Sequence, residues 1–113
     1  MAVVRKAVRV QLPERQDGKD MSYRFESLDY PATERRFNSY YAEFFPVARD
    51  HVRLHTHAGV EFIYALKGRL AVHVEGQEYM LGSGDSMYFD SGLPHGYRRG
   101  GASTCSAIVV TTA

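Results

Sequence analysis

Residues 55–68 read HTHAGVEFIYALKG, and the interpretation of the whole chain starts from this stretch. His55 and His57 are two positions apart, so in a strand both side chains point the same way, with about 6.6 Å between their backbones. A short loop then lets Glu61, at the start of the next strand, supply a carboxylate from the side. A third imidazole, that of His95, would come from across the fold. The sequence therefore predicts one metal site built from three imidazoles and one carboxylate.

The remainder of the chain is typical of an all-β protein. Short runs rich in aromatic and β-branched residues alternate with turns, and Gly68, Gly76 and Gly84 fall where hairpins would need positive φ. Many short strands at even spacing in so small a chain predict a jelly-roll β-barrel, which buries one face of each sheet and leaves few bare edges. The expected strands cover residues 40–47, 52–56, 62–66, 70–74, 78–81, 86–89 and 106–111.

Two parts are distinguished along the chain. Residues 1–20 form an N-terminal strand and connector, with residues 1–12 alternating as a strand would and residues 13–20 polar and marked by proline and glycine. Residues 21–113 form the single barrel domain. The first ten residues contain no long apolar run, so neither a signal peptide nor a membrane span is expected, and the cytoplasm is the expected location.

Composition excludes several classes of function. The chain has 113 residues, 44% of them apolar and 24% charged, as expected for one globular domain. Fourteen basic and thirteen acidic side chains leave a formal charge of +1, so the balance does not indicate a nucleic-acid or membrane partner. The single cysteine, Cys105, cannot form an internal disulfide and is interpreted as a small apolar residue in a strand.

Four further residues bear on the site. His51 and His73 are excluded from the ligand set, because surface or hydrogen-bonded roles are favoured for both. Arg53 and Tyr97 share strand parity with the predicted ligands and are candidates for binding a substrate in the same cavity. For both residues, packing or the anchoring of an anion is an equally good interpretation.

The predicted ligand set determines which metals fit. Neutral imidazole nitrogen and carboxylate oxygen suit first-row divalent ions, so Fe, Mn, Zn and Ni all remain open. Three histidines and one glutamate leave one or two coordination positions vacant. Since one carboxylate does not neutralise a dication, the vacancy favours an anionic or enol-like oxygen ligand.

The same residues resemble the first motif of the cupin superfamily. That motif runs Gly, five residues, His, one residue, His, three or four residues, Glu, six residues, Gly. His55, His57, Glu61 and Gly68 match it, whereas Arg49 stands in place of the opening glycine. The resemblance implies a double-stranded β-helix and a metal held by these side chains.

A second cupin motif is met in part. It runs Gly, five residues, Pro, one residue, Gly, two residues, His, three residues, Asn. Gly84, Gly92 and His95 match this pattern, while Asp90 replaces the proline and Arg99 the asparagine. The metal-binding histidine of the motif is therefore retained.

Within the superfamily, residues 20–112 resemble the C-terminal sensor domain of bacterial transcription regulators that carry an N-terminal helix-turn-helix. Only about twenty residues precede this region, too few for a helix-turn-helix unit. The chain is therefore not expected to bind nucleic acid directly. The stretches that carry this resemblance are residues 21–25, 61–64, 84–98 and 109–112.

Three functions stay open from the sequence. The first is a module that binds a small molecule at the metal, as an effector sensor would. The second is a small metal-dependent cupin enzyme of the dioxygenase or isomerase type, and the third is a storage or structural barrel. The alternating segment from Val3 to Leu12 could add a strand to the open sheet edge of a second copy, so a homodimer is expected.

Overall fold

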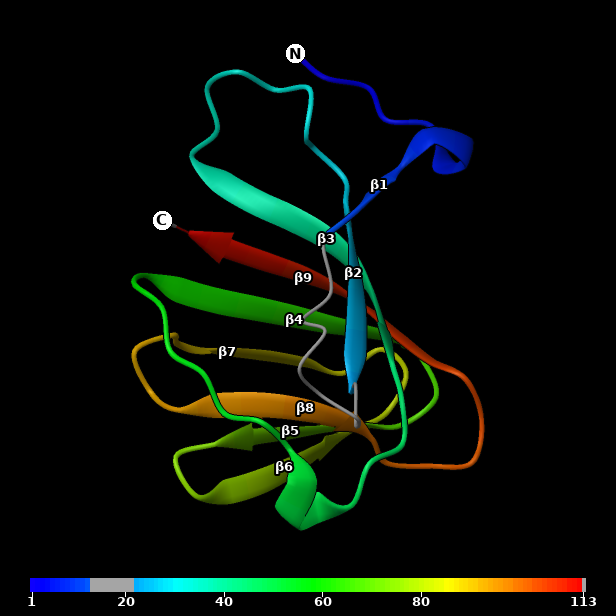
Figure 1. The fold of residues 1–113 in the computed structure, drawn as a ribbon, viewed down its shortest axis with the longest axis vertical. Coiled ribbons are helices and arrows are strands. Elements are labelled where there is room, and N and C mark those ends of the chain that lie inside the picture. The colour runs from blue at the N-terminus through cyan, green and yellow to red at the C-terminus, as the bar shows by residue number, and fades with distance from the viewer. Residues whose placement is uncertain (13–21, 113) are drawn as a thin grey trace.

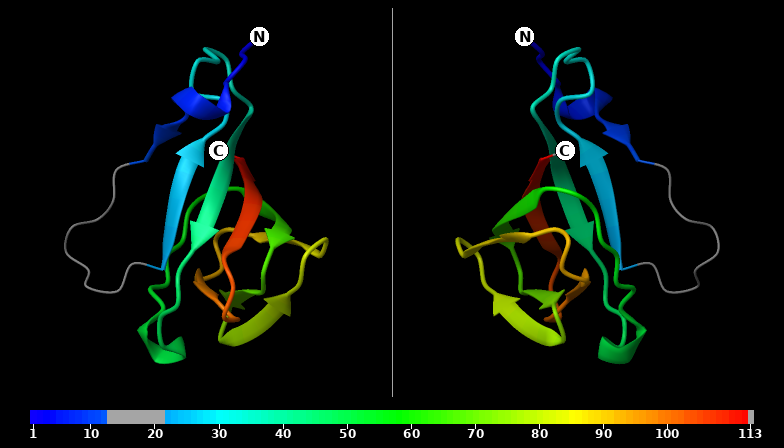
Figure 2. Two further views of the ribbon diagram at one scale, coloured as in Figure 1. Left: turned by 90° about the vertical axis from the view of Figure 1, so that its right-hand side faces the viewer. Right: turned by 90° about the vertical axis from the view of Figure 1, so that its left-hand side faces the viewer.

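The computed structural model describes residues 1–12 and 22–112. The connector expected over residues 13–20 lies outside the described residues. Within the described parts, nine strands form two antiparallel sheets that face each other (Figure 1). The strands enclose a common interior, with β1 at the outer edge of the large sheet (Figure 2). The expected all-β jelly-roll fold is confirmed.

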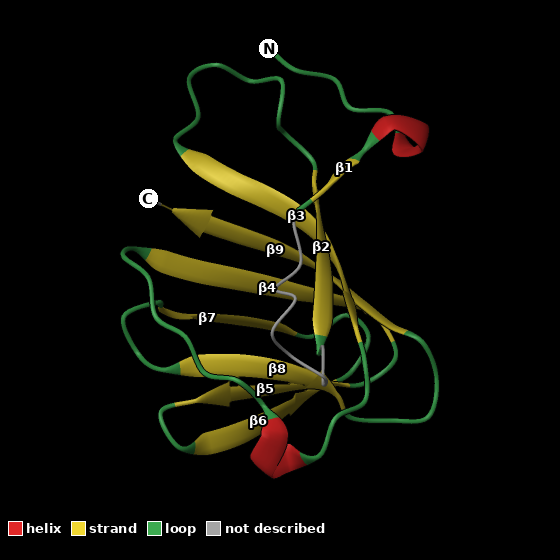
Figure 3. Cartoon of the chain, in the orientation of Figure 1, coloured by secondary structure: helices red, strands yellow, loops and turns green. Residues whose placement is uncertain are grey.

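The large sheet has six strands and the small sheet three. In spatial order the large sheet comprises β1 (Val10–Gln11), β2 (Tyr23–Ser27), β3 (Phe37–Phe44), β9 (Cys105–Thr112), β4 (Val60–Lys67) and β7 (Ser86–Asp90). The small sheet comprises β6 (Gln77–Leu81), β5 (Leu70–Val74) and β8 (His95–Arg99). Two short 3-10 helices are present: η1 (Lys6–Val8) precedes β1, and η2 (Arg49–His51) lies between β3 and β4 (Figure 3).

Two strand predictions were wrong. In residues 1–12, Val10–Gln11 alone form a strand, and residues 6–8 turn into η1, so the alternating pattern overstated the strand. The strand expected over residues 52–56 is reduced to an isolated bridge between His55 and His95. The other expected strands are present with ends shifted by a few residues, and the structure adds β2 and β8.

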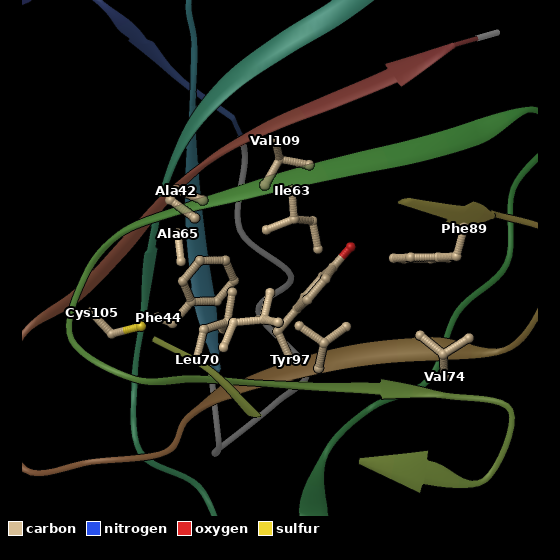
Figure 4. Packing of buried hydrophobic residues seen from close by; sticks show 13 residues of the cluster. Ala42, Phe44, Ile63, Ala65, Leu70, Val74, Phe89, Tyr97, Cys105 and Val109 are labelled. Carbon is tan, nitrogen blue, oxygen red and sulfur yellow. The ribbon is translucent and has the colours of Figure 1, made fainter. Parts of the chain in front are cut away.

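The alternation along β4 shows how the sequence builds the core. Glu61, Ile63 and Ala65 face the interior and are buried, whereas Phe62 and Tyr64 face outward and are exposed. Burial of a large apolar side chain contributes about 1.5–3 kcal/mol, so the interior positions of the strands hold the barrel together. The buried cluster comprises Ala42, Phe44, Ile63, Ala65, Leu70, Val72, Val74, Leu81, Phe89, Tyr97, Cys105, Ala107 and Val109 (Figure 4).

Cys105 has the role predicted for it. Its side chain is buried in the core, and burial raises the pKa of the thiol to about 11, although Arg99 acts in the opposite direction. The thiol therefore stays protonated and packs as a small apolar group. Within residues 1–12 and 22–112, no helix is long and apolar enough to cross a membrane.

Candidate metal centre

The segment that carries His55 and His57 is held against β8 by backbone hydrogen bonds. The His55 amide donates to the His95 carbonyl at 2.9 Å, and the His95 amide donates back at 3.0 Å. The His57 amide donates to the Ser91 carbonyl at 3.0 Å. These bonds keep the segment extended, so the two side chains face the same centre although no regular strand forms there.

Gly96 allows this close approach. A Cβ atom at this position would lie 2.5 Å from the Arg53 carbonyl oxygen and 2.6 Å from a methyl group of Val52. Any other residue would therefore push the segment away from β8. Sequence reasoning did not identify this role, although a glycine directly after a ligand histidine in a strand is a recognisable signal of close backbone contact.

The three predicted histidines converge. One ring nitrogen from each of His55, His57 and His95 lies within 4.8 Å of the others. Donors that each lie about 2.1 Å from one shared ion can be at most about 4.2 Å apart, so the nitrogens would have to move closer together to bind one ion. The ring centroid of His95 is 4.4 Å from that of His55 and 5.1 Å from that of His57. The three histidines could hold a metal ion.

His95 carries the clearest sign that the site fits a metal. Its side chain is 0% exposed, and Nδ1 donates a hydrogen bond to the Leu93 carbonyl at 2.8 Å. The second nitrogen, Nε2, is buried and has no hydrogen-bond partner among the described residues. Buried polar atoms are rarely left unpaired, and a metal-binding histidine typically donates its other nitrogen to a carbonyl. Nε2 is thus the ring atom of His95 that a metal ion could bind.

Glu61 places a carboxylate beside the histidines. Its Oε1 lies 3.3 Å from Nε2 of His57 and 3.5 Å from Nε2 of His95, and the side chain is 1% exposed. Burial by itself would raise the pKa of Glu61, but His95 and the Tyr97 hydroxyl favour the anion more strongly, so the pKa is lowered. Glu61 is therefore ionised and can supply an anionic oxygen.

The histidines differ in their electrostatic surroundings. Burial, together with repulsion from His95, lowers the pKa of His55 to about 4. Burial also opposes the charged form of His95, but the Glu61 carboxylate and the Leu93 carbonyl raise the pKa of this ring above its usual value. His55 is therefore neutral at pH 7, as a metal ligand must be.

The two predicted substrate-binding residues lie in different surroundings. Tyr97 is 1% exposed, and its hydroxyl donates a hydrogen bond to Oε2 of Glu61. The rings of Tyr23 and Phe44 pack against it, each with its centroid 5.5 Å away. Arg53 has an exposed side chain, and its carbonyl faces Gly96. Tyr97 thus lies in the core and orients Glu61, whereas Arg53 lies at the surface.

His73 has a structural partner, as expected. Its Nε2 is hydrogen-bonded to Glu78, and the same carboxylate accepts two hydrogen bonds from Arg98, both of 2.8 Å. His51 is exposed in η2. Neither residue belongs to the group of three converging nitrogens.

Comparisons with known proteins bear on the family and the fold of the chain. The family profile of the cupin domain matches residues 44–111, which is more than half of the chain. Among curated protein sequences, none matches significantly.

Solved structures with the same fold include the crystal structure of Fe(II)-HppE with the alternative substrate (S)-1-HPP, with a TM-score of 0.82 and 20% identity, which covers 98% of this chain and 60% of that one. Hydroxypropylphosphonic acid epoxidase from S. wedmorenis has a TM-score of 0.78 and 19% identity, and the match covers 98% of this chain and 59% of that one. The same enzyme in complex with fosfomycin has a TM-score of 0.75 and 17% identity, and the match covers 100% of this chain and 59% of that one. The chain thus spans about 60% of the length of these structures, and at such identities the likeness shows the fold.

Proposed function

The chain belongs to the cupin domain family, and from this premise we propose that it binds one divalent transition-metal ion and, at that ion, a small molecule. The ligands would be His55, His57, Glu61 and His95. The observation that carries the proposal is the buried Nε2 of His95, which has no hydrogen-bond partner within the described residues and faces the Glu61 carboxylate at 3.5 Å.

The chemistry of the ligand follows from the charge of the site. When bound, a dication would supply an electrophilic centre with vacant positions for an oxygen donor. Glu61 offers one negative charge, and His55 is neutral because its pKa is about 4. The remaining positive charge favours an anionic or enol-like ligand. Arg53, which is exposed near the segment that carries the histidines, would add a cation for such a ligand.

Reversible binding, as in the effector-sensing domain of a transcription regulator, is the first candidate function. The Tyr97 hydroxyl already donates to Glu61, and burial, reinforced by the Glu61 charge, raises the pKa of Tyr97 well above its usual value. This hydroxyl is therefore unsuited to proton transfer at neutral pH.

We further propose that the protein acts in the cytoplasm as a homodimer.

A small metal-dependent enzyme of the dioxygenase or isomerase type is the second candidate. The similarity in fold to an epoxidase, with structures determined with Fe(II) and with Co(II), supports it. A cupin barrel of this shape is compatible with redox or Lewis-acid chemistry. The two candidates differ in whether the small molecule leaves the site unchanged.

Native mass spectrometry with elemental analysis tests the proposal. Protein purified without added metal is expected to carry one transition-metal ion per chain, and His95→Ala is expected to lose it. His51→Ala is the matched control, because His51 is exposed in η2, outside the group of converging nitrogens. Equal metal content in wild type and His95→Ala would refute the metal site.

The same samples separate the two candidates. A co-purified small molecule that remains chemically unchanged after incubation with the metal-loaded protein and oxygen supports binding. Conversion of that molecule by wild type, and not by His95→Ala, supports the enzyme. Dimer mass in the same spectra tests the proposed homodimer, and a monomer at micromolar concentration would contradict it.

A further inference from the structure

A charged groove of about 600 Å³ lies on the outer face of the large sheet, away from the metal centre. We propose that this groove binds a small organic carboxylate, independently of any metal. Its volume is within the range of about 300–1,000 Å³ that is usual for small-molecule sites. Its lining comprises Lys6, Arg9, Glu26, Tyr41, Glu43, Leu66, Lys67 and Ser106.

The groove is on the opposite face of the sheet from the core. In β4, Ala65 is buried in the barrel, so its neighbour Leu66 points outward. Likewise in β9, Ala107 belongs to the core and Ser106 lies on the other face. The N-terminal segment contributes the remaining wall through Lys6 and Arg9. A ligand here would therefore contact none of the predicted metal ligands.

The charges of the groove favour an anion. Glu26 is paired with Arg9 at 3.3 Å, and Glu43 is paired with Arg24. Both acidic side chains of the lining are thus neutralised. Lys6 and Lys67 make no ion pair with the described residues, so two ammonium groups remain for a ligand.

Ser106 supplies an observation independent of these charges. The residue is 1% exposed, and its hydroxyl oxygen is buried without a hydrogen-bond partner in the described parts of the chain. It lies opposite both Glu43 and Lys67 in the sheet, where the pairing of β4 with β9 shifts between Ala65 and Lys67. Because a buried hydroxyl without a partner is costly, a ligand atom that accepts its hydrogen bond would be favoured.

The rest of the lining indicates an apolar body for the ligand. Leu66 is 37% exposed at the groove, and the Tyr41 ring carries the Arg9 guanidinium 4.7 Å from its centroid. A carboxylate at Lys67 and Ser106 could place a flat apolar group on Leu66. Benzoate has this combination and is the probe of choice.

The test is an NMR titration of the full-length protein with benzoate and, in parallel, with neutral benzamide. We expect saturable shifts of the Leu66, Lys67 and Ser106 amides with benzoate, in wild type and in metal-free His95→Ala alike. Benzamide is expected to bind about tenfold or more weakly, because it lacks the charge recognised by the lysines. Absence of saturable shifts, or equal affinity for the two probes, would overturn the proposal.

Two variants and one control locate the site. Lys67→Glu is expected to weaken benzoate binding by about tenfold or more, and Ser106→Ala by about threefold, since each removes a donor. Arg36→Glu changes the net charge by the same amount at an exposed position that does not line the groove. Equal weakening by Arg36→Glu and Lys67→Glu would show a nonspecific charge effect and refute the site. Ser106→Ala should fold normally, because it removes a buried hydroxyl that has no partner among the described residues.

Discussion

Strand β8 contributes to two clusters of histidine and carboxylate that differ in one respect. On the interior side, His95 lies beside Glu61, while on the other side Arg98 reaches the Glu78 carboxylate that also binds His73. Glu78 has hydrogen-bond partners for both of its oxygens. Glu61 likewise has a partner for each oxygen, His57 for one and Tyr97 for the other, but the nearby Nε2 of His95 is buried without a partner in the described chain.

The difference separates a structural ion pair from a site built for a further group. Both clusters contain a histidine and a carboxylate within 3.5 Å, so proximity alone does not distinguish them. What distinguishes them is whether every buried polar atom is satisfied. The following predictions test this distinction, beginning with the largest expected effect.

Removal of His95 should have the largest effect. His95→Ala is expected to weaken metal binding by about 100-fold or more, because it removes a buried ligand. His73→Ala should leave metal affinity unchanged, since His73 binds Glu78 on the other side of β8. Competition with a fluorescent chelator measures both affinities. Similar loss in both variants would contradict the distinction between the clusters.

A methyl group at Gly96 should displace the segment of residues 52–57, which lies against β8. Gly96→Ala is expected to destabilise the fold by about 1–3 kcal/mol and to weaken metal binding, because its Cβ would meet the Arg53 carbonyl oxygen at 2.5 Å. Gly82→Ala is the control, since its Cβ would have Asp85 as its nearest contact, at 3.6 Å. Denaturant unfolding of the metal-free proteins, followed by metal titration, gives both quantities. Unchanged stability of Gly96→Ala would show that residues 52–57 can move away from β8 at little cost in free energy.

Loss of the Tyr97 hydroxyl should leave Glu61 less firmly oriented without creating a cavity in the core. Tyr97→Phe retains the buried ring but removes the hydrogen bond to Oε2 of Glu61, so metal affinity should fall by about tenfold. Tyr79→Phe makes the same chemical change at an exposed site, where the hydroxyl donates to Gln77. Isothermal titration calorimetry with a divalent metal compares them. An unchanged affinity in Tyr97→Phe would mean that Glu61 is oriented by other contacts.

The smallest effect concerns the pH dependence of the structural cluster. Hydrogen bonds from Arg98 lower the pKa of Glu78, with burial acting in the opposite direction and His73 assisting Arg98. The stabilisation from Glu78 is therefore present above the carboxyl pKa of the unfolded chain, about 4.3, and lost as pH falls through the lower folded value. Glu78→Gln should cost about 1 kcal/mol at pH 7, because it weakens a charge-assisted pair.

Denaturant unfolding of metal-free wild type and Glu78→Gln, at pH 7 and at pH 3, measures this contribution. The difference in free energy of unfolding should shrink at the lower pH. A difference that stays constant between the two pH values would show that the carboxylate charge does not contribute.

The sequence predicted most of the barrel because the alternation of residue types in strands such as β4 reflects burial directly. It predicted that the side chains of His55 and His57 point the same way, but for a partly mistaken reason. Their common direction comes from hydrogen bonds to the carbonyls of His95 and Ser91, not from a regular strand, and such partners become visible only when distant segments are placed together.

The hydrogen bond from Tyr97 to Glu61 could not be predicted from the sequence for a related reason. Its hydroxyl partner, Glu61, is 36 positions away and belongs to the opposite sheet. Strand parity correctly placed Tyr97 toward the interior. Parity does not show, however, whether an interior side chain lines a ligand cavity or packs in the core. At the N-terminus, alternation overstated the strand, because within residues 1–12 the strand itself spans Val10–Gln11.

The attachment of residues 52–57 to β8 has a consequence for how the protein would open. An ion held by His55, Glu61 and His95 would cross-link this segment to both sheets at once. Local detachment of the segment would then require release of the ion, so amide hydrogen exchange at residues 52–57 should slow in proportion to metal occupancy. The cation would in that case govern how long residues 52–57 stay attached to β8, as well as the binding of a small molecule.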